Sequence, residues 1–599
     1  MPLIPAIQMQ ATVIFHLLNN SAMEKLIATL VVSSLLLLST LHLKAESSLL
    51  SMLPEQTVFL IEVDDLKEMS ESIESGPLGE FSQSNAWGKI GEWAEGEMQT
   101  ELGDDSGDIE LLFERMKEWE ESMNGGVVLA VGNLEKMLSR KMPDVTLLIE
   151  TDFSQNKLND TLKWIKKEVI SSGGSFSWQK EKIAGEEVHW IGPDPTKEKN
   201  EQMAIFLSGQ TLGLLLGGKD HVTDTLLRAA GNSSGASLAR NDNYLDLFEE
   251  IEEGAARIFL DFEAIGGLIK VAGSIPKMQI PENPFGVTTT NLISAMGIDS
   301  MQCLGIQLDP SDEDVVISSA IFFSKFEGIF SFVQPEGTDE AILYDFMPAQ
   351  AFTSTSMRYD FSKLWTTTEK IISELSPQLL LLVNSQIQAF EEQAGVAFRK
   401  DIIGALGNEA FSFSLLPGKV KTMDDFEKNS DFFGISLKDA KLFDRSLRTM
   451  IDSFSSGNDL FQERVHQGVT IRKLRGIEES GLSFSYAVTE KWLLLAMGED
   501  NQLNQIINRM NGKGRSLWQQ KEIKRALGDL ADGSNQIDFA DFEKLVSFLS
   551  SIAVISSESD RQLDLKVSDF PDFPYFLMAW SKNVRRGIKA KARLYPKSI

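Results

Sequence analysis

The stretch Leu214–Asp220, Leu-Leu-Leu-Gly-Gly-Lys-Asp, returns about 280 residues later as Leu494–Asp500, Leu-Leu-Ala-Met-Gly-Glu-Asp. The tripeptide Asp261-Phe262-Glu263 returns as Asp541-Phe542-Glu543 at the same spacing. Similarity at a constant spacing is the sequence signature of an internal repeat. The sequence therefore predicts that one module has been copied in tandem.

Each predicted copy also carries a helix-like apolar face whose positions are spaced by four, three and four residues. The first face consists of Leu158, Leu162, Ile165 and Val169, and the second of Phe443, Leu447, Met450 and Phe454. The spacing between copies is constant within such elements and drifts between them, as insertions in loops would produce. Because the apolar pattern is kept while the residues differ, we expect the two copies to share a fold.

Strand-like and helix-like segments follow one another in each copy. The β-branched and aromatic run Thr57–Val63 precedes Asp64-Asp65, which can cap the next helix. Later runs such as Ala204–Leu207 and Thr211–Leu216 are joined by short polar turns, which is typical of antiparallel hairpins. The predicted fold class is α+β: two tandem repeated units, each a mostly antiparallel sheet with helices packed on one face.

The length of the chain also requires more than one domain. A single hydrophobic core stops growing at about 250–300 residues, and this chain has 599 residues. Pro335 and Gly337 lie in a polar stretch between the copies, which favours a linker at that point. We therefore expect the first unit at 46–333, the linker at 334–346 and the second unit at 347–599.

The N-terminal part has the features of a targeting segment. The charged start Met23-Glu24-Lys25 precedes the apolar run Leu26–Leu41, and the small residue Ala45 follows. This order predicts a secretory signal peptide at 23–45, although an uncleaved N-terminal anchor is the alternative. Residues 1–22 contain no Lys or Arg, and we interpret them as a mis-called extension upstream of the true start. The expected location is the periplasm, the cell envelope or the extracellular space, with anchoring in the inner membrane if the segment is not cleaved.

The charge of the chain excludes one class of partner. The formal net charge is −30, so the overall field opposes binding to nucleic acid. Basic residues cluster only near the C-terminus, at Lys582, Arg585, Arg586, Lys589, Lys591, Arg593 and Lys597. There they alternate with apolar residues, which predicts a half-buried strand with a cationic face better than a site for an anionic surface.

Residues that could carry catalysis or bind a metal are scarce. His189, His221 and His466 are far apart in the sequence, and no metal-binding or nucleophile motif contains them. Cys303 lies in an apolar run, which predicts a small buried side chain. Paired Asp and Glu residues could serve glycoside hydrolysis, but in a chain with 87 acidic residues such pairs have little meaning.

Two segments only partly match a ligand-binding motif. Gly217-Gly218-Lys219-Asp220 lacks the spacing and the hydroxyl residue of a phosphate-binding loop, so a turn at a strand end is the better interpretation. Asp532–Phe542 resembles part of a calcium-binding loop but lacks the acid and the glycine that the loop requires. We expect Asp541 and Asp261 to cap helices instead. No catalytic, cofactor-binding or metal-binding residues are therefore predicted.

The opening Leu53–Leu66, followed by Gly76-Pro77-Leu78-Gly79, resembles a family of large exported bacterial proteins known only as a domain of unknown function. Met347–Phe352 is similar to a second such opening. The resemblance implies an envelope location and transfers no catalytic residue.

The function that the sequence favours is a non-catalytic binding or structural role in the bacterial cell envelope, with an unknown envelope protein or polymer as partner. One alternative is a hydrolase of envelope polymers that uses paired carboxylates. The other is a membrane-tethered accessory protein of assembly or secretion. A binding protein predicts a cleft lined by aromatic residues, whereas a hydrolase predicts two carboxylates in a pocket, one of them with a raised pKa.

Overall fold

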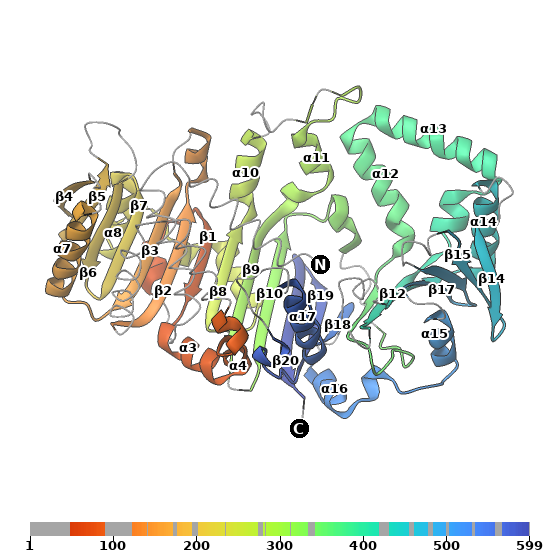
Figure 1. Ribbon diagram of the computed structural model, residues 1–599. Helices are drawn as coiled ribbons and strands as arrows, with labels where there is room; N and C mark the ends of the chain where they lie inside the picture. Colours follow the sequence, from red (N-terminus) through yellow and green to blue (C-terminus); the bar gives the residue numbers. More distant parts are fainter. Residues whose placement is uncertain are drawn as a thin grey trace. The chain divides into compact units, whose positions relative to one another are not determined.

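The computed structural model describes most of the chain beyond its first 47 residues (Figure 1). The described residues are 48–89, 122–139, 142–171, 176–193, 202–233, 235–272, 280–281, 283–311, 313–333, 342–417, 430–454, 460–476, 483–498, 502–529, 533–557 and 566–597. The predicted signal segment 23–45 and the predicted extension 1–22 lie outside them. Both therefore stay predictions.

The described residues form two compact units. Unit 1 takes its described residues from 1–76, 94–268 and 305–312, and unit 2 takes them from 77–93, 269–304 and 313–599. Several segments of the predicted first copy thus belong to the second compact unit. The boundaries of the compact units therefore differ from the predicted boundaries of the two copies. The boundaries of the copies stay a prediction.

The predicted linker at 334–346 is described only from residue 342 onward. Ile342, Leu343, Tyr344 and Phe346 pack against the hydrophobic core of unit 2. Tyr344 is buried, and its ring contacts those of Phe411 and Trp492. The residues after 341 therefore belong to a packed core rather than to a free connection.

Unit 1 is built around an antiparallel sheet. Its strands are β1 (Thr57–Val63), β2 (Met123–Gly132), β3 (Asp144–Thr151), β4 (Phe176–Ile183), β5 (Glu186–Pro193), β6 (Gln202–Ser208), β7 (Thr211–Gly217) and β8 (Ala256–Asp261). Its helices are η1 (Ser48–Met52), α3 (Leu66–Ser75), η3 (Leu134–Ser139), α7 (Gln155–Ser171), α8 (Lys219–Ala229), η4 (Leu238–Arg240) and α9 (Asp242–Glu250). The strands lie in the order β4-β5-β6-β7-β3-β2-β1-β8, and each neighbouring pair is antiparallel. The predicted hairpin of β6 and β7 is confirmed.

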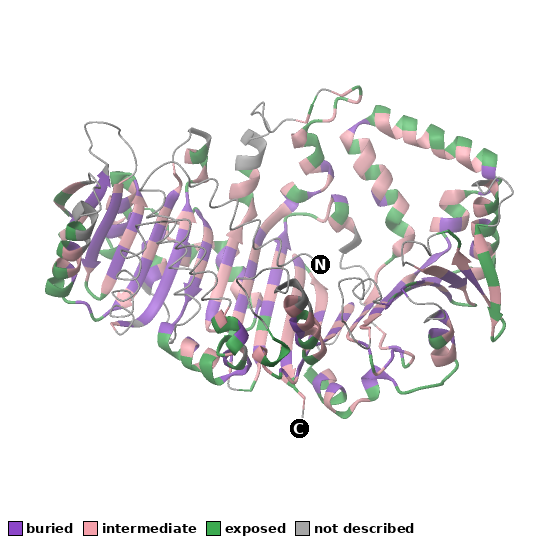
Figure 2. Cartoon of the chain, viewed as in Figure 1, coloured by how far each residue is buried: buried purple, intermediate pink, exposed green. Residues whose placement is uncertain are grey.

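Helices cover both faces of this sheet. Leu158 of α7 packs with Ile149 of β3 in one hydrophobic cluster. Thr146 of β3 points to the opposite face, because side chains alternate along a strand, and it contacts His221 of α8. β2, β3 and β6 are therefore mostly buried, as Figure 2 shows.

Two elements contain residues of both units, namely α10 (Phe262–Ala272) and β9 (Met301–Pro310). The strands of unit 2 are β10 (Val315–Phe323), β11 (Thr353–Arg358), β12 (Leu406–Leu415), β13 (Ser430–Leu437), β14 (Phe461–His466), β15 (Val469–Leu474), β16 (Phe484–Val488), β17 (Trp492–Met497), β18 (Gln536–Asp541), β19 (Tyr575–Val584) and β20 (Gly587–Pro596). Its longer helices are α4 (Pro77–Ser82), α11 (Thr289–Ala295), α12 (Leu364–Leu375), α13 (Pro377–Ala394), α14 (Ala440–Phe454), α15 (Gln502–Met510), α16 (Lys521–Ala526) and α17 (Phe542–Ser557). Short helices are η6 (Ile298–Ser300), η7 (Gly328–Val333), η8 (Phe361–Lys363), η9 (Phe398–Ile403), η12 (Leu517–Gln519), η13 (Leu527–Asp529) and η14 (Val567–Asp569).

The sheet of unit 2 is also antiparallel. Its strand order is β14-β15-β16-β17-β13-β12-β11-β18-β19-β20-β10. The part of this order from β14 to β18 is the same as the order in unit 1. Strand β14 corresponds to β4, β11 to β1, and β18 to β8. The helices α12 and α13 follow β11 and pack against each other.

Unit 2 also has helices on both faces of its sheet. Phe443 of α14 packs with Ala410 of β12 in one cluster, whereas Ile506 of α15 packs with the next residue, Phe411, in another. The prediction of helices on only one face was wrong. A strand with apolar residues at consecutive positions must bury both faces, and runs such as Val127–Val131 in the sequence are of this kind.

Several local predictions are confirmed. Asp65 caps α3 by accepting the Lys67 amide at 2.9 Å. Asp261 accepts the amide of Ala264 at 3.1 Å, and Asp541 accepts that of Lys544 at 3.3 Å, so both cap helices as predicted. Cys303 is buried.

Lys589, Lys591 and Arg593 of the basic C-terminal cluster lie on β20, as the alternation predicted. Its Arg593 is bound to acidic side chains: Nε donates to Asp314 at 2.6 Å and Nη1 to Asp529 at 2.9 Å. Both units combine helices with an antiparallel sheet, and the predicted α+β class is confirmed.

Candidate functional site

The three histidines considered in the sequence lie on different elements. His189 of β5 contacts Glu187, and His466 of β14 contacts Asn508. His221 lies in the first turn of α8. Throughout the described ranges, no group of three His, Cys, Asp or Glu side chains is placed to hold a metal ion. His221 lines a cavity of unit 1.

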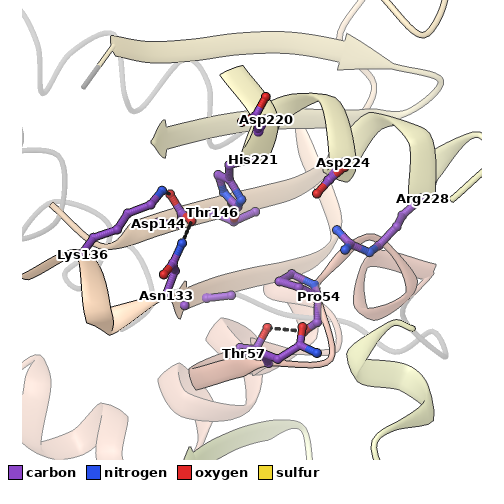
Figure 3. Close-up of a pocket in the computed structure, with 13 residues that line it drawn as sticks. Pro54, Thr57, Asn133, Lys136, Asp144, Thr146, Asp220, His221, Asp224 and Arg228 are labelled. Carbon is purple, nitrogen blue, oxygen red and sulfur yellow. Dashed lines mark hydrogen bonds and ion pairs between the residues drawn. The ribbon is translucent and has the colours of Figure 1, made fainter. Parts of the chain in front are cut away.

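The cavity lies in unit 1 and has a volume of about 350 Å³ (Figure 3). Polar side chains line it from β3, from α8, and from the segments before β1 and after β2. The sheet face between β3 and α8 leaves room here because small residues, Ala130 and Thr146, pair across the strands. The first predicted hallmark of a binding site, an aromatic lining, is absent among the residues that line this cavity.

One wall consists of a carboxylate that is already neutralised. Asp144, at the start of β3, is bound to the ammonium of Lys136 and accepts the Asn133 amide at 3.1 Å. Its carboxylate is buried, and a buried charge of this kind needs such partners. Both partners hold the carboxylate of Asp144 in place within the wall.

His221 forms the adjoining wall. Its Nε2 lies 2.8 Å from Oγ1 of Thr146. Burial, reinforced by the cations Lys136 and Arg228 against the opposing effect of Asp144, holds the pKa of His221 below its usual value. The imidazole is therefore neutral at physiological pH.

A glycine permits this close arrangement. Gly217 ends β7 with a φ of 149°, a conformation that side chains rarely adopt. A Cβ atom at this position would lie 2.5 Å from Oδ1 of Asp144 and 3.1 Å from Cδ2 of His221. The segment Gly217–Asp220 is thus a strand-end turn, as predicted, and it serves the cavity by letting the chain pass close to both side chains.

Arg228, near the end of α8, differs from the other charged residues of the wall. Its Nε is buried and has no hydrogen-bond partner. Within the part of the chain that the structure describes, its guanidinium makes no hydrogen bond or ion pair with any side chain. Asp224 lies one helical turn earlier and also lines the cavity, yet no ion pair joins the two. Arg228 is therefore a cation that the cavity leaves available.

Unit 2 fills the corresponding space with side chains. Phe413 and Phe432 form the cross-strand pair of β12 and β13 that corresponds to Ala130 and Thr146 in the strand order. Their rings stack with centroids 4.4 Å apart, and both are buried in the core. The polar cavity is thus a property of unit 1 at a place where unit 2 is apolar.

The arginine of unit 2 has partners. Arg509 is the penultimate residue of α15, as Arg228 is of α8. Its Nη2 donates to Oε1 of Gln350 and its Nη1 to the carbonyl of Arg515, both at 2.9 Å. Gln56, which corresponds to Gln350, lines the cavity of unit 1 without such a contact among the residues described there.

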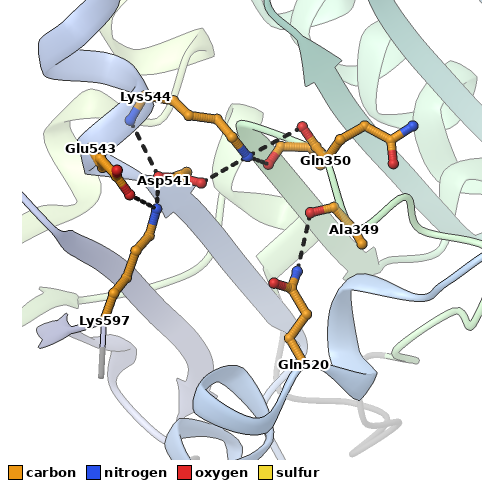
Figure 4. A network of polar contacts seen from close by, with 8 residues as sticks. Ala349, Gln350, Gln520, Asp541, Glu543, Lys544 and Lys597 are labelled. Carbon is orange, nitrogen blue, oxygen red and sulfur yellow. Dashed lines mark hydrogen bonds and ion pairs between the residues drawn. The ribbon is translucent and has the colours of Figure 1, made fainter. Parts of the chain in front are cut away.

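Unit 2 also has a polar network beside this contact, because Lys544 donates to the carbonyl of Gln350, whose side chain accepts from Arg509 (Figure 4). Asp541 is buried and pairs with Lys544 at 2.8 Å and with Lys597. Lys597 also pairs with Glu543 at 2.7 Å, and Lys544 donates to the carbonyl of Ala351 at 3.3 Å. All charges in this network have partners, which indicates that it stabilises the fold rather than binding a ligand.

A carboxyl group with a raised pKa exists elsewhere in unit 1. Burial, with repulsion from Glu68 and Glu150, raises the pKa of Asp65 to about 7. Asp65 caps α3 and does not line the cavity. The pocket with two carboxylates that a hydrolase would need is therefore not formed by this residue and Asp144.

The sequence does not predict Asp144, Arg228 or His221 as residues of a binding site. A charged residue at the start of a strand or the end of a helix is common, so neither position is conspicuous alone. A comparison of the two copies could have indicated the cavity. The small pair Ala130 and Thr146 of the first copy aligns with two phenylalanines in the second copy.

Comparison with known proteins gives one family. Residues 315–560 match the model of a family described as "Protein of unknown function (DUF3352)". The predicted resemblance to a family known only as a domain of unknown function is confirmed by this match. None of the curated proteins matches the chain.

Solved structures give only distant similarity. Crystal form I of TP0453 is 10% identical, covers 49% of this chain and 90% of its own, and has a TM-score of 0.23. Crystal form III of TP0453 is 10% identical, covers 47% and 81% of the two chains, and has the same TM-score of 0.23. Scores this low do not support an argument about fold or function.

Proposed function

We propose that this chain is an exported, non-catalytic binding protein of the bacterial cell envelope, and that the cavity of unit 1 is its ligand site. The observation that carries the proposal is the state of Arg228, a partly buried cation that faces a cavity without a partner from the described chain. Lys136 and Asp144 of the same wall, by contrast, are paired with each other. A pocket with a few polar groups left over is typical of a binding site.

A cavity-filling variant tests this function. We expect low-molecular-mass extract of the envelope to raise the unfolding midpoint of the wild-type protein, because a ligand that binds the folded state stabilises it. Replacing Ala130 and Thr146 together by phenylalanine copies the aromatic pair of unit 2 and should abolish the rise. Equal midpoints for wild-type protein with and without extract would contradict the proposal. If the double variant does not fold, Arg228→Gln serves the same purpose.

The exported location rests on the sequence of residues 23–45. The order of charged start, apolar run and small residue is that of a secretory signal. None of the helices in the described ranges combines the length and the apolar character that a bilayer span requires. N-terminal sequencing of the protein from fractionated cells tests the location, and we expect a mature chain that begins at Glu46. A chain that needs detergent for extraction and begins at Met23 would favour the membrane-tethered alternative.

We further propose that the two units descend from one duplicated module. The shared strand order supports this, and so do equivalent contacts outside the strands. Pro54 pairs with Ser237 in unit 1, and Pro348 pairs with Ser516 in unit 2. Superposing β1–β8 on β11–β18 tests the proposal, because unrelated sheets would not bring these four residues into register.

The second equivalent contact is a side-chain hydrogen bond. Asn241 Nδ2 donates to the carbonyl of Glu55 at 3.2 Å, and Gln520 Nε2 donates to the carbonyl of Ala349 at 3.1 Å (Figure 4). Each donor precedes a helix of its unit, α9 and α16 respectively. Shared hydrogen bonds in irregular segments are harder to explain by convergence than a shared sheet.

A further inference from the structure

We propose that the cavity of unit 1 binds a small zwitterion whose carboxylate pairs with Arg228 and whose ammonium group lies against Asp224. This inference rests on the proposed binding function and names the chemical class of the ligand. It applies to free amino acids and to very short peptides alike, since both carry these two groups.

The carboxylate of the ligand is inferred from a comparison of Arg228 with Arg509. Arg509 uses two nitrogens of its guanidinium to bind two oxygen atoms, one from Gln350 and one from Arg515. Arg228 has the same place at the end of its helix but no such acceptors in the described chain. A carboxylate presents two oxygens to the planar guanidinium, in the geometry that arginine binds best. A bound carboxylate would thus replace the acceptors that unit 2 supplies from its own chain.

The ammonium half follows from Asp224. Its carboxylate is exposed and has no hydrogen bond or ion pair with any residue that the structure describes. Figure 3 shows it pointing toward the same space as the guanidinium of Arg228. An acid and a base one helical turn apart commonly pair with each other, but here they stay separate. Two unpaired groups of opposite charge around one cavity fit a ligand that carries both charges.

The charges of the lining fit a zwitterion better than a simple ion. The cavity is lined by the acids Asp144, Asp220 and Asp224 and by the bases Lys136 and Arg228. A phosphate dianion would be repelled by this lining, since only Arg228 is free to neutralise it. A simple cation would be attracted by Asp220 and Asp224, but it would leave the guanidinium of Arg228 without an acceptor. A zwitterion adds no net charge to the site.

The size of the cavity fits a small ligand. Its volume of about 350 Å³ corresponds to about twelve water molecules at roughly 30 Å³ each. Asn133 and the neutral imidazole of His221 border the same space and can bind further polar atoms of the ligand. The wall is therefore suited to a compact polar molecule and not to a polymer chain.

Histidine signals in a nuclear magnetic resonance titration test the proposal. Glycine, alanine of either hand and dialanine are the probes, and acetate, methylamine and inorganic phosphate are the comparison compounds. We expect a zwitterionic probe to shift the imidazole signal of His221 and to leave that of His466, in unit 2, unchanged. Acetate and methylamine each offer half of the contacts, so their affinity should be lower by about tenfold or more.

Variants assign the two halves of the site. Arg228→Gln and Asp224→Asn should each weaken the zwitterion by about tenfold or more, whereas the matched variant Arg509→Gln should not change its affinity. Tighter binding of phosphate than of any zwitterion would overturn the inference, and so would equal affinity in Arg228→Gln and wild-type protein.

The two proposals fail separately. If none of the zwitterions shifts His221 but envelope extract still stabilises the wild-type protein and not its cavity-filled variant, the ligand class is wrong and the binding function stands. If neither the probes nor the extract has an effect, both proposals are wrong.

Discussion

Arg228 and Arg509 occupy the same place in their units, yet only Arg509 is bound by oxygen atoms of the described chain. Each is followed after three residues by a glycine with positive φ, Gly231 at 68° and Gly512 at 80°. Each glycine amide donates to the carbonyl of its arginine, at 2.9 Å and 2.8 Å. The backbone around the two arginines is therefore alike, and the difference lies in what surrounds the guanidinium.

The first prediction compares the two arginines in stability. Arg509→Gln removes two hydrogen bonds from a charged donor and should lower the free energy of unfolding by about 1–2 kcal/mol, at roughly 0.5–1 kcal/mol per bond, because both bonds are exposed to solvent. Arg228→Gln removes no hydrogen bond from the described part of the ligand-free protein. It should therefore change the free energy of unfolding by less than about 0.5 kcal/mol. Urea unfolding of both variants measures the difference. Similar losses in the two variants would mean that Arg228 has structural partners.

The second prediction concerns the aromatic pair of unit 2. Phe432→Ala removes a buried ring that stacks on Phe413, and it should destabilise the protein by about 3–5 kcal/mol. Thr146→Ala, at the corresponding place in unit 1, removes only a hydroxyl and a methyl group beside an existing cavity. Its cost should be about 1 kcal/mol. A comparable cost for both in thermal unfolding would show that the space in unit 1 is packed as tightly.

The third prediction is a pH dependence caused by Asp65. Its raised pKa, about 7, lets the folded chain keep a proton that the unfolded chain releases above about pH 4. Asp65 therefore makes stability fall as pH rises from about 4 to about 7, and the loss is complete above pH 7. Asp65→Asn keeps a side chain that can cap α3 and should raise stability at pH 8 by about 1–2 kcal/mol, after allowance for screening by solvent.

Asp360 provides the matched control for this prediction. It caps η8 in unit 2, and hydrogen bonds from Ser362 together with the charge of Lys438 hold its pKa below the usual value despite burial. Asp360→Asn should thus leave the slope of stability between pH 5 and pH 8 unchanged. The Asp65 prediction fails if Asp65→Asn leaves that slope as it is in the wild-type protein.

The fourth prediction tests the network of Asp541. Lys544→Met or Lys597→Met alone leaves the carboxylate one ammonium partner, whereas the double variant leaves a buried charge unpaired. The double variant should lose more stability than the two single losses combined, by about 1–3 kcal/mol. In an Asp541→Asn background this excess should vanish. An excess that persists there would mean that the lysines act through other contacts.

The sequence predicted the elements better than their arrangement. Thr57–Val63 is β1 with the predicted bounds, and Leu158 and Leu162 are buried on α7 as their spacing required. The apolar period within an element is set by local geometry, so it can be read without knowing the neighbours. The number of covered faces depends on which helices return to the sheet, and that information is spread over the whole unit.

The candidate site could not be predicted from motifs. Asp144 and Arg228 come from a strand and a helix about 80 residues apart, and only the antiparallel pairing of β3 with β7 brings α8 over β3. Arg228 lacks hydrogen-bond acceptors because of the residues that surround it in the folded chain, and a sequence motif does not show this. The internal repeat offered an indirect route, because it shows where one copy is small and polar while the other is aromatic.

The most direct test of ligand binding in unit 1 is native mass spectrometry of the mature protein, purified gently from the cells that export it. If the cavity is a ligand site, wild-type protein and Arg509→Gln should carry one molecule of low mass with a carboxylate and an amine, and Arg228→Gln should be free of it. A wild-type protein that is free of any such molecule, or an Arg228→Gln variant that retains it, would contradict the proposed role of the cavity.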